Sequence, residues 1–171
     1  SGMTSASLVL SDLSRNLPYD SYSFKLDAAS SDFIDVSTST FGVGLNNLSV
    51  SAWVKFNDVT ANRYDCIASV DGSVGRVWQL FKWNSSNGSG ISFQLRNNSG
   101  TSVFTSNTAF VPSSNVWYNC TATYDGSSAK IYINGEIKDT VSLSGILNSS
   151  TSQNFKIGNN GFSNESLDGR I

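Results

Sequence analysis

Apolar and polar side chains alternate at every second residue along most of this chain. In the segment 48–56, LSVSAWVKF, one side carries Val50, Ala52, Val54 and Phe56, and the other carries Ser51, Trp53 and Lys55. Successive side chains of a β-strand point to opposite faces, whereas an α-helix repeats every 3.6 residues. The pattern therefore predicts half-buried strands and no helix longer than a turn or two.

The same alternation recurs almost throughout the chain, and Gly, Asn, Asp and Ser separate the alternating segments. These residue types favour tight turns, and Asn-Gly at 134–135 is a strong hairpin signal. Many short strands with turns between them are typical of two sheets packed face to face or of a barrel. We expect strands within 21–27, 32–37, 48–56, 65–71, 76–83, 91–97, 102–107, 117–125, 129–135, 136–143 and 154–159.

Length and charge exclude several classes of partner. A chain of 171 residues fits one domain. Its net charge of −2 and isoelectric point of about 4.9 provide no positive groove for nucleic acid. No apolar run approaches the roughly 18 residues that a membrane span needs, so we expect no membrane insertion.

The first residues, SGM, are typical of a two-residue cloning scar before a native start at Met3. We interpret residues 1–20 as this tag scar followed by a lead-in strand, and residues 21–171 as the folded domain. No secretory signal peptide is visible after Met3. A native start there predicts a protein that is not exported by the general route.

Two cysteines, Cys66 and Cys120, lie on different expected strands. They are either two buried thiols, which we favour, or a disulfide, which requires Cα atoms within roughly 7 Å of each other. Sequence alone does not decide between the two. Their spacing matches no zinc site.

Several motifs occur in a familiar order: SYSFKLDAASSDFIDVS (21–37), LSVSAWVKF (48–56), WYNCTATYDGSSAKIYINGE (117–136), FKIGNN (155–160) and LDGRI (167–171). From about residue 21 to residue 171 the chain resembles the laminin-G-like branch of the concanavalin A-like lectin/glucanase superfamily. The resemblance implies an all-β, antiparallel jelly-roll sandwich with one concave and one convex sheet. It also implies a lectin-like module that binds glycans or proteins.

The chain departs from this family at its end. Family members commonly continue past the GRI motif with an acidic pair and a further strand, but this chain ends at Ile171. Either the sequence is truncated at its last strand, or another chain completes the sheet. An unpaired edge would favour pairing with another subunit, which makes a homo-oligomer possible.

Residues for catalysis are scarce. Retaining glycosidases need two carboxylates roughly 5–5.5 Å apart. The two glutamates, Glu136 and Glu165, are far apart in the sequence, and Asp32 and Asp35 point to opposite sides of a strand. Without histidine, a Ser-His-Asp or Cys-His arrangement is impossible. We expect no enzyme, and rank a diverged glycoside hydrolase last.

Calcium is the one ion that the resemblance suggests, and no cofactor is required. Family members often begin their calcium site in the loop that corresponds to 26–32, so Asp27 and Asp32 match acidic positions, with Asp168 near them in the fold. Calcium takes six to eight oxygen ligands. The alternative, which we favour, is that Asp27 and Asp32 cap turns through bonds to the backbone.

Carbohydrate binding needs an aromatic face for stacking and polar groups for hydroxyls. The segment 75–88 carries both kinds of side chain, and alternation places one set outside the core. The alternative is that these aromatic rings pack in a second small cluster. The candidate carbohydrate-binding residues are Arg76, Gln79, Lys82 and Trp83.

We predict a non-catalytic carbohydrate- or cell-surface-binding adhesion module with a glycan or a cell-surface or virion protein as partner. A polar, charge-poor composition is common among extracellular and virion β-proteins, which suggests the extracellular space or a phage or virion surface. The alternative is a structural or assembly domain that pairs its open edge with another subunit.

Overall fold

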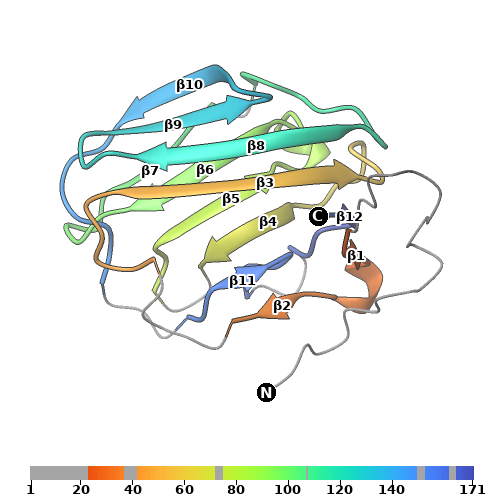
Figure 1. The fold of residues 1–171 in the computed structure, drawn as a ribbon, viewed down its shortest axis with the longest axis horizontal. Coiled ribbons are helices and arrows are strands. Elements are labelled where there is room, and N and C mark those ends of the chain that lie inside the picture. Colours follow the sequence, from red (N-terminus) through yellow and green to blue (C-terminus); the bar gives the residue numbers. More distant parts are fainter. Residues whose placement is uncertain (1–22, 37–41, 72–74, 107, 150–152, 162–164) are drawn as a thin grey trace, which may run out of the picture.

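The computed structural model describes residues 23–36, 42–71, 75–106, 108–149, 153–161 and 165–171. The described residues form two six-stranded antiparallel sheets packed as layers (Figure 1), which confirms the all-β sandwich. Sheet A has the order β1-β12-β3-β8-β9-β10, and sheet B has the order β2-β11-β4-β5-β6-β7. The expected lead-in strand within 1–20 lies outside the described residues.

The strands of sheet A are β1 (Lys25–Leu26), β3 (Leu48–Phe56), β8 (Trp117–Tyr124), β9 (Ser128–Ile133), β10 (Glu136–Ser142) and β12 (Gly169–Arg170). Those of sheet B are β2 (Ile34–Asp35), β4 (Asp65–Val70), β5 (Trp78–Lys82), β6 (Ile91–Arg96), β7 (Ser102–Phe104) and β11 (Lys156–Ile157). Two single-turn 3₁₀ helices, η2 (Ala28–Ser30) and η3 (Ser85–Asn87), lie in the connections. None of these helices is long and apolar enough to cross a membrane.

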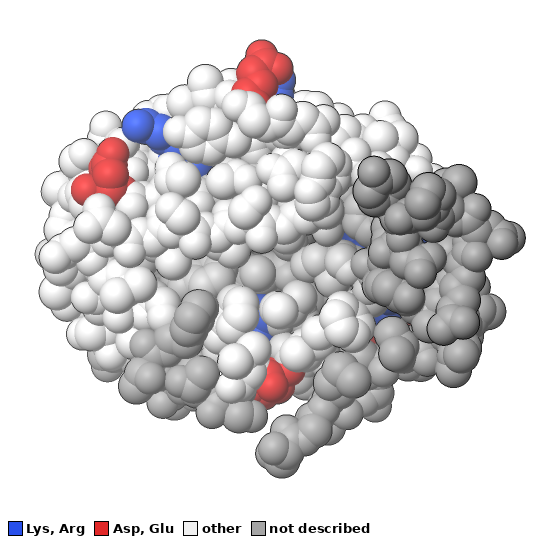
Figure 2. All heavy atoms as spheres, viewed as in Figure 1, with Lys and Arg blue, Asp and Glu red and all other residues white. Residues whose placement is uncertain are grey.

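The period-two pattern forms the core. β3 pairs with β8 without a register shift, from Leu48 opposite Tyr124 to Lys55 opposite Trp117. Their inward side chains meet those of sheet B, where Trp78, Leu80 and Phe93 are almost completely buried. The outward side of sheet A is exposed and carries few, scattered charges (Figure 2). Trp53 stands on this side and is 57% exposed.

The GRI motif lies inside a sheet. Gly169 of β12 is opposite Phe56 of β3 on one side and Leu26 of β1 on the other. A Cβ atom at Gly169 would overlap the backbone carbonyl oxygen of Lys55, so this close approach requires glycine. The C-terminal segment is therefore not an open edge, and the outer strands of sheet A are β1 and β10.

A buried ion-pair network joins β4 and β5 to β12. Lys82 and Asp65 are both fully buried, and the Lys82 Nζ atom lies 3.0 Å from Asp65 Oδ2. The Arg63 guanidinium bridges Asp65 at 3.0 Å and Asp168 at 2.7 Å. The Asp168 amide in turn donates to Asp65. Each buried charge thus has a partner of opposite sign, which such burial requires.

Both cysteines are free and buried, as we favoured. Cys66 belongs to β4 in sheet B, and Cys120 belongs to β8 in sheet A. Burial raises the pKa of both thiols, that of Cys120 to about 12. The thiols therefore remain protonated at neutral pH.

Candidate functional site

The alternation of β5 places the candidate functional site on the outer face of sheet B. Trp78 and Leu80 point into the core, whereas Gln79 and Phe81 point outward. Trp83 follows β5 on the same outward side. On this face, polar and aromatic side chains line a depression.

The depression has an inner part of about 150 Å³, which we call the inner hollow. β4, β5, β6 and β7, with their flanking residues, contribute most of its walls, and the segment after β11 contributes the rest. Its lining residues are Tyr64, Arg76, Gln79, Phe81, Trp83, Gln94, Phe104 and Glu165.

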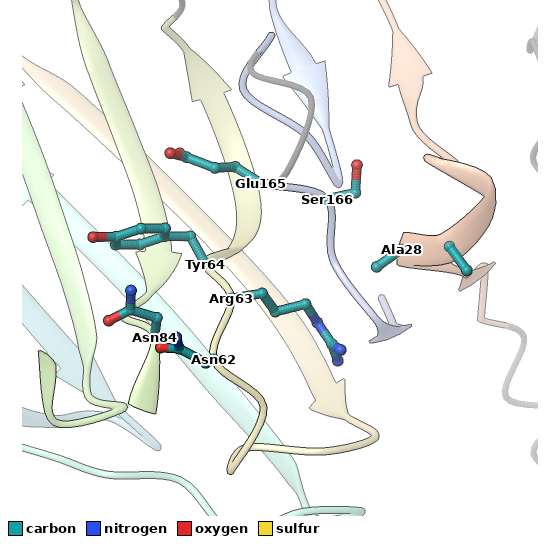
Figure 3. A pocket seen from close by; sticks show the side chains of 8 residues that line it. Ala28, Asn62, Arg63, Tyr64, Asn84, Glu165 and Ser166 are labelled. Atoms are coloured by element: carbon teal, nitrogen blue, oxygen red, sulfur yellow. The ribbon is translucent and has the colours of Figure 1, made fainter. Parts of the chain in front are cut away.

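A wider second part of about 630 Å³ is the rim hollow, whose lining residues are drawn in Figure 3. Tyr64 and Glu165 line both parts, so we treat them as one groove. In Figure 3, Asn62, Tyr64 and Asn84 lie on one side of the rim hollow and Ala28 lies on the other. The remaining lining residues are Ala29, Arg63 and Ser166.

Four aromatic rings form one wall of the inner hollow. Trp83 is central, with its ring centroid 5.1 Å from that of Phe81, 5.5 Å from Phe104 and 5.7 Å from Tyr64. All three contacts are tilted, which is a favourable arrangement for aromatic rings. The four rings therefore give the inner hollow one aromatic wall.

Amide side chains form the floor of the inner hollow. They are joined by a chain of hydrogen bonds, which we call the relay. Asn160 Nδ2 donates to a carboxylate oxygen of Glu165 and, over 2.9 Å, to Gln79 Oε1. Gln79 Nε2 then donates to Gln94 Oε1 over 2.7 Å. A carboxylate group only accepts, so the relay has a fixed direction: Asn160 must donate, and Gln79 must pass a donor on to Gln94.

The relay ends on a donor that has no acceptor. Among the described residues, neither Gln94 Nε2 nor Trp83 Nε1 has a hydrogen-bond partner, and both nitrogen atoms are shielded from solvent. A buried unpaired donor costs about 1–3 kcal/mol. Both residues line one small hollow, where an ordered water molecule or a ligand acceptor would satisfy these atoms.

The cations around the groove are already paired within the protein. The Arg76 Nε atom donates to both carboxylate oxygens of Asp71, at 2.8 and 3.0 Å. Arg63 pairs with Asp65 and Asp168. Of the described residues that line the groove, Glu165 alone is acidic. The groove therefore has little net charge.

Three of the four predicted carbohydrate-binding residues come together: Arg76, Gln79 and Trp83 all line the inner hollow. Lys82 does not join them, and this part of the prediction needs correction. Lys82 alternates with Gln79 and Trp83, so its side chain points to the core side of β5, where it pairs with Asp65. The clustered aromatic rings also match the alternative interpretation of a second small cluster.

The three aspartates of the predicted calcium site are not brought together. Among the described residues, no group of three or more acidic, histidine or cysteine side chains could hold a metal ion. Asp27 caps η2 by accepting from the amide of Ala29, and Asp32 accepts from the amide of Asp27. Asp168 accepts from Arg63 and Asn57. These partners do not fit a calcium site built from these residues.

Sequence reasoning missed part of the groove. Gln94 is an outward residue of the alternating segment 91–97, so the period-two pattern could have identified it. Glu165 and Asn160 gave no such signal, because they lie outside every alternating segment. The pairing of β11 with β4 and the bridge between Cys66 and Ser166 bring this part of the chain to sheet B.

The family described as "Concanavalin A-like lectin/glucanases superfamily" (Laminin_G_3) matches residues 28–171 of the chain. No curated protein sequence matches the chain. The family match covers both hollows of the groove.

Three solved structures illustrate the likeness of fold. A putative carbohydrate binding protein from Bacteroides ovatus has a TM-score of 0.62 at 19% identity, and the match covers 81% of this chain and 38% of that protein. Domains LG4-5 of the mouse laminin alpha1 chain have a TM-score of 0.58 at 13% identity, and the match covers 81% of this chain and 36% of that protein. Domain 4 of AbnA, an arabinanase from Geobacillus stearothermophilus in complex with arabinotriose, has a TM-score of 0.58 at 15% identity. This match covers 86% of this chain and 66% of that one. The chain thus spans a little over a third of the first two structures and about two thirds of the third.

Proposed function

The chain belongs to the concanavalin A-like lectin/glucanases superfamily, and from this premise we propose that it is a non-catalytic module that binds carbohydrate in the groove on sheet B. One observation carries the proposal: a four-ring aromatic wall stands beside an amide floor, and among the described residues the donors Trp83 Nε1 of the wall and Gln94 Nε2 of the floor have no acceptor. Sugar sites combine these two elements, because C–H groups stack on rings while hydroxyl groups need placed polar partners.

The rim hollow would hold further sugar units. Its side chains from Asn62, Asn84 and Ser166 are uncharged and able to both donate and accept hydrogen bonds. Because it adjoins the inner hollow through Tyr64 and Glu165, a short oligosaccharide would span both parts. The neighbour bound to arabinotriose and the putative carbohydrate binding protein support this interpretation.

The number of carboxyl groups in the groove favours binding without catalysis. Glycoside hydrolysis generally uses two carboxyl groups on either side of the scissile bond. Of the described groove residues, only Glu165 carries one, and it is hydrogen-bonded to Asn160. We propose a cell or virion surface as the setting, since a polar chain with only 14% charged residues is common there.

A glycan array, probed with and without calcium, tests the proposal. We expect binding in both conditions, and loss of binding in the Trp83→Ala variant. Trp53→Ala is the matched control, because Trp53 is exposed on the opposite sheet. Binding that survives Trp83→Ala but disappears with Trp53→Ala would place the site on sheet A and contradict the proposal.

A second candidate function is assembly through a sheet edge. β10 is a seven-residue outer strand of sheet A, and its Ile137 is 51% exposed. Exposed strand edges pair readily with other chains. A stable oligomer in light scattering, lost on replacing Ile137 by lysine, together with an empty glycan array, would favour this function.

A further inference from the structure

We infer that the inner hollow recognises the acetamido group of an N-acetylated sugar. This inference rests on the proposed function and names the ligand class for the same groove. It follows from the direction of the amide relay, from the unpaired donors and from the aromatic wall.

The relay decides what the floor offers to a ligand. An isolated glutamine amide can rotate by half a turn and exchange donor for acceptor. Here Glu165 can only accept, so Asn160 donates to it, and the direction passes through Gln79 to Gln94. Gln94 must then present its Nε2 donor, and Trp83 Nε1 is a donor by chemistry. Both require an acceptor, and a carbonyl oxygen provides one without adding a further donor.

The surroundings select an acetamido group among carbonyl-bearing substituents. The ring of Phe104, which contacts Trp83 and is 40% exposed, offers an apolar surface for a methyl group. Glu165 Oε1 has no hydrogen bond among the described residues, so it can accept from an amide N–H. The Glu165 charge would repel the carboxylate of an acidic sugar, while Asp71 neutralises Arg76. One carbonyl, one N–H and one methyl group therefore each find a partner.

The volume agrees with this assignment. A water molecule occupies about 30 Å³ in the liquid, so the inner hollow of about 150 Å³ holds a substituent and part of one ring. The rest of the sugar would extend past Tyr64 and Glu165 into the rim hollow.

Calorimetry with methyl glycosides tests the inference on the intact chain. We expect the N-acetylglucosamine and N-acetylgalactosamine glycosides to bind roughly tenfold or more tightly than the glucose and galactose glycosides, as one or two added hydrogen bonds would give. Equal affinities would overturn the inference and leave the proposed function standing. Binding of no glycoside or oligosaccharide at all would overturn both.

Two variants separate the relay from general effects on the groove. Gln94→Glu keeps an acceptor for Gln79 and removes the donor, so the preference for the acetamido group should disappear. In Glu165→Gln, residue 165 can donate as well as accept, so the hydrogen bonds of the relay can run in either direction. The preference for the acetamido group should then fall severalfold. Glu136→Gln is the matched control, because Glu136 is 75% exposed and does not line the groove. A preference that persists in Gln94→Glu would overturn the inference.

A measurement on the unaltered protein covers the case in which a variant fails to fold. The four tryptophans give four indole N–H signals in a nitrogen–proton spectrum, and nuclear Overhauser contacts with the rings of Phe81 and Phe104 identify that of Trp83. We expect the Trp83 signal alone to move downfield with N-acetylglucosamine, as a new hydrogen bond requires. An unmoved Trp83 signal at saturation would overturn the inference.

Discussion

Lys82 carries a charge inside the sandwich, where an unpaired charge is costly. Its Nζ atom lies 3.0 Å from Asp65 Oδ2, and both side chains are fully buried. Asp65 also holds Arg63, which lines the rim hollow. The network therefore links the stability of the core to the position of a groove residue.

Replacing Lys82 by methionine should lower the free energy of unfolding by about 3–5 kcal/mol, because Asp65 keeps its burial but loses a partner. Urea unfolding measures the change. Lys130→Met is the control, since Lys130 is 34% exposed and lies 3.9 Å from Asp125. It should cost less than about 1 kcal/mol. Equal losses in the two variants would show that the Lys82 pair contributes no more than a surface pair.

The two thiols should be unreactive in the folded protein. A thiolate is the reactive form, and burial raises the pKa of Cys120 to about 12 and that of Cys66 further still. We expect no labelling by a thiol reagent at about pH 8, and two labels per chain after denaturation. Labelling of the native protein at the denatured rate would contradict the packing of both strands.

The same shift gives stability a dependence on pH with a defined sign. Above the unfolded thiol pKa of about 8.5, the unfolded chain ionises while the folded chain keeps its protons. The free energy of unfolding should therefore fall as the pH rises from about 8.5 toward the folded pKa of Cys120, which is about 12. Cys120→Ala should show a shallower fall over this range, measured by urea unfolding at each pH.

At the scale of elements, the long strands were the most predictable. The alternating segment 48–56 has the same first and last residue as β3. Its apolar and polar residues alternate over the whole length, so the sequence shows which side chains lie on each face. Among the described residues of the expected strands at 21–27, 32–37 and 154–159, only two residues of each form a strand. β12 was missed altogether, since a two-residue strand has no period and exists only through its partners.

Two glycines in these elements should respond differently to alanine. Gly135, in the turn between β9 and β10, has φ +82°, and no atom lies within 4 Å of the position that a Cβ would occupy there. Gly135→Ala should cost about 1 kcal/mol, from the left-handed backbone alone. Gly169→Ala should cost about 3 kcal/mol, because its Cβ meets the Lys55 carbonyl and separates β12 from β3. Thermal unfolding distinguishes the two, and equal shifts would contradict the close approach at Gly169.

For the whole molecule, the family and the sandwich could be predicted from motif order and period, whereas the groove could be predicted only in part. Alternation places Gln79 and Trp83 on one face, but it does not reveal the segment after β11. Asn160 and Glu165 reach the floor through contacts with residues far earlier in the chain, and no local pattern encodes such contacts. Lys82 was misassigned because its charge suggested a ligand contact, although its position in the alternation places it in the core.

Ligand binding should stabilise the entire fold, and calcium should not. A sugar at about a hundred times its dissociation constant raises the free energy of unfolding by about 2.7 kcal/mol. Calcium and a chelator should leave the unfolding midpoint unchanged, because Asp27, Asp32 and Asp168 already bond to protein groups. Differential scanning fluorimetry measures both effects, and a rise with calcium alone would show that the ion has a site.

The position of β12 between β1 and β3 also determines the order of events during synthesis. Residues 25–26 and 55–56 remain separated until residues 169–170 arrive between them. A nascent chain on the ribosome can form the β8–β9–β10 hairpins once residues 117–142 have emerged, but sheet A closes only after residues 169–170 follow. Loop closure over such separations is slow, so β1 is exposed to chaperones and proteases until β12 pairs with it.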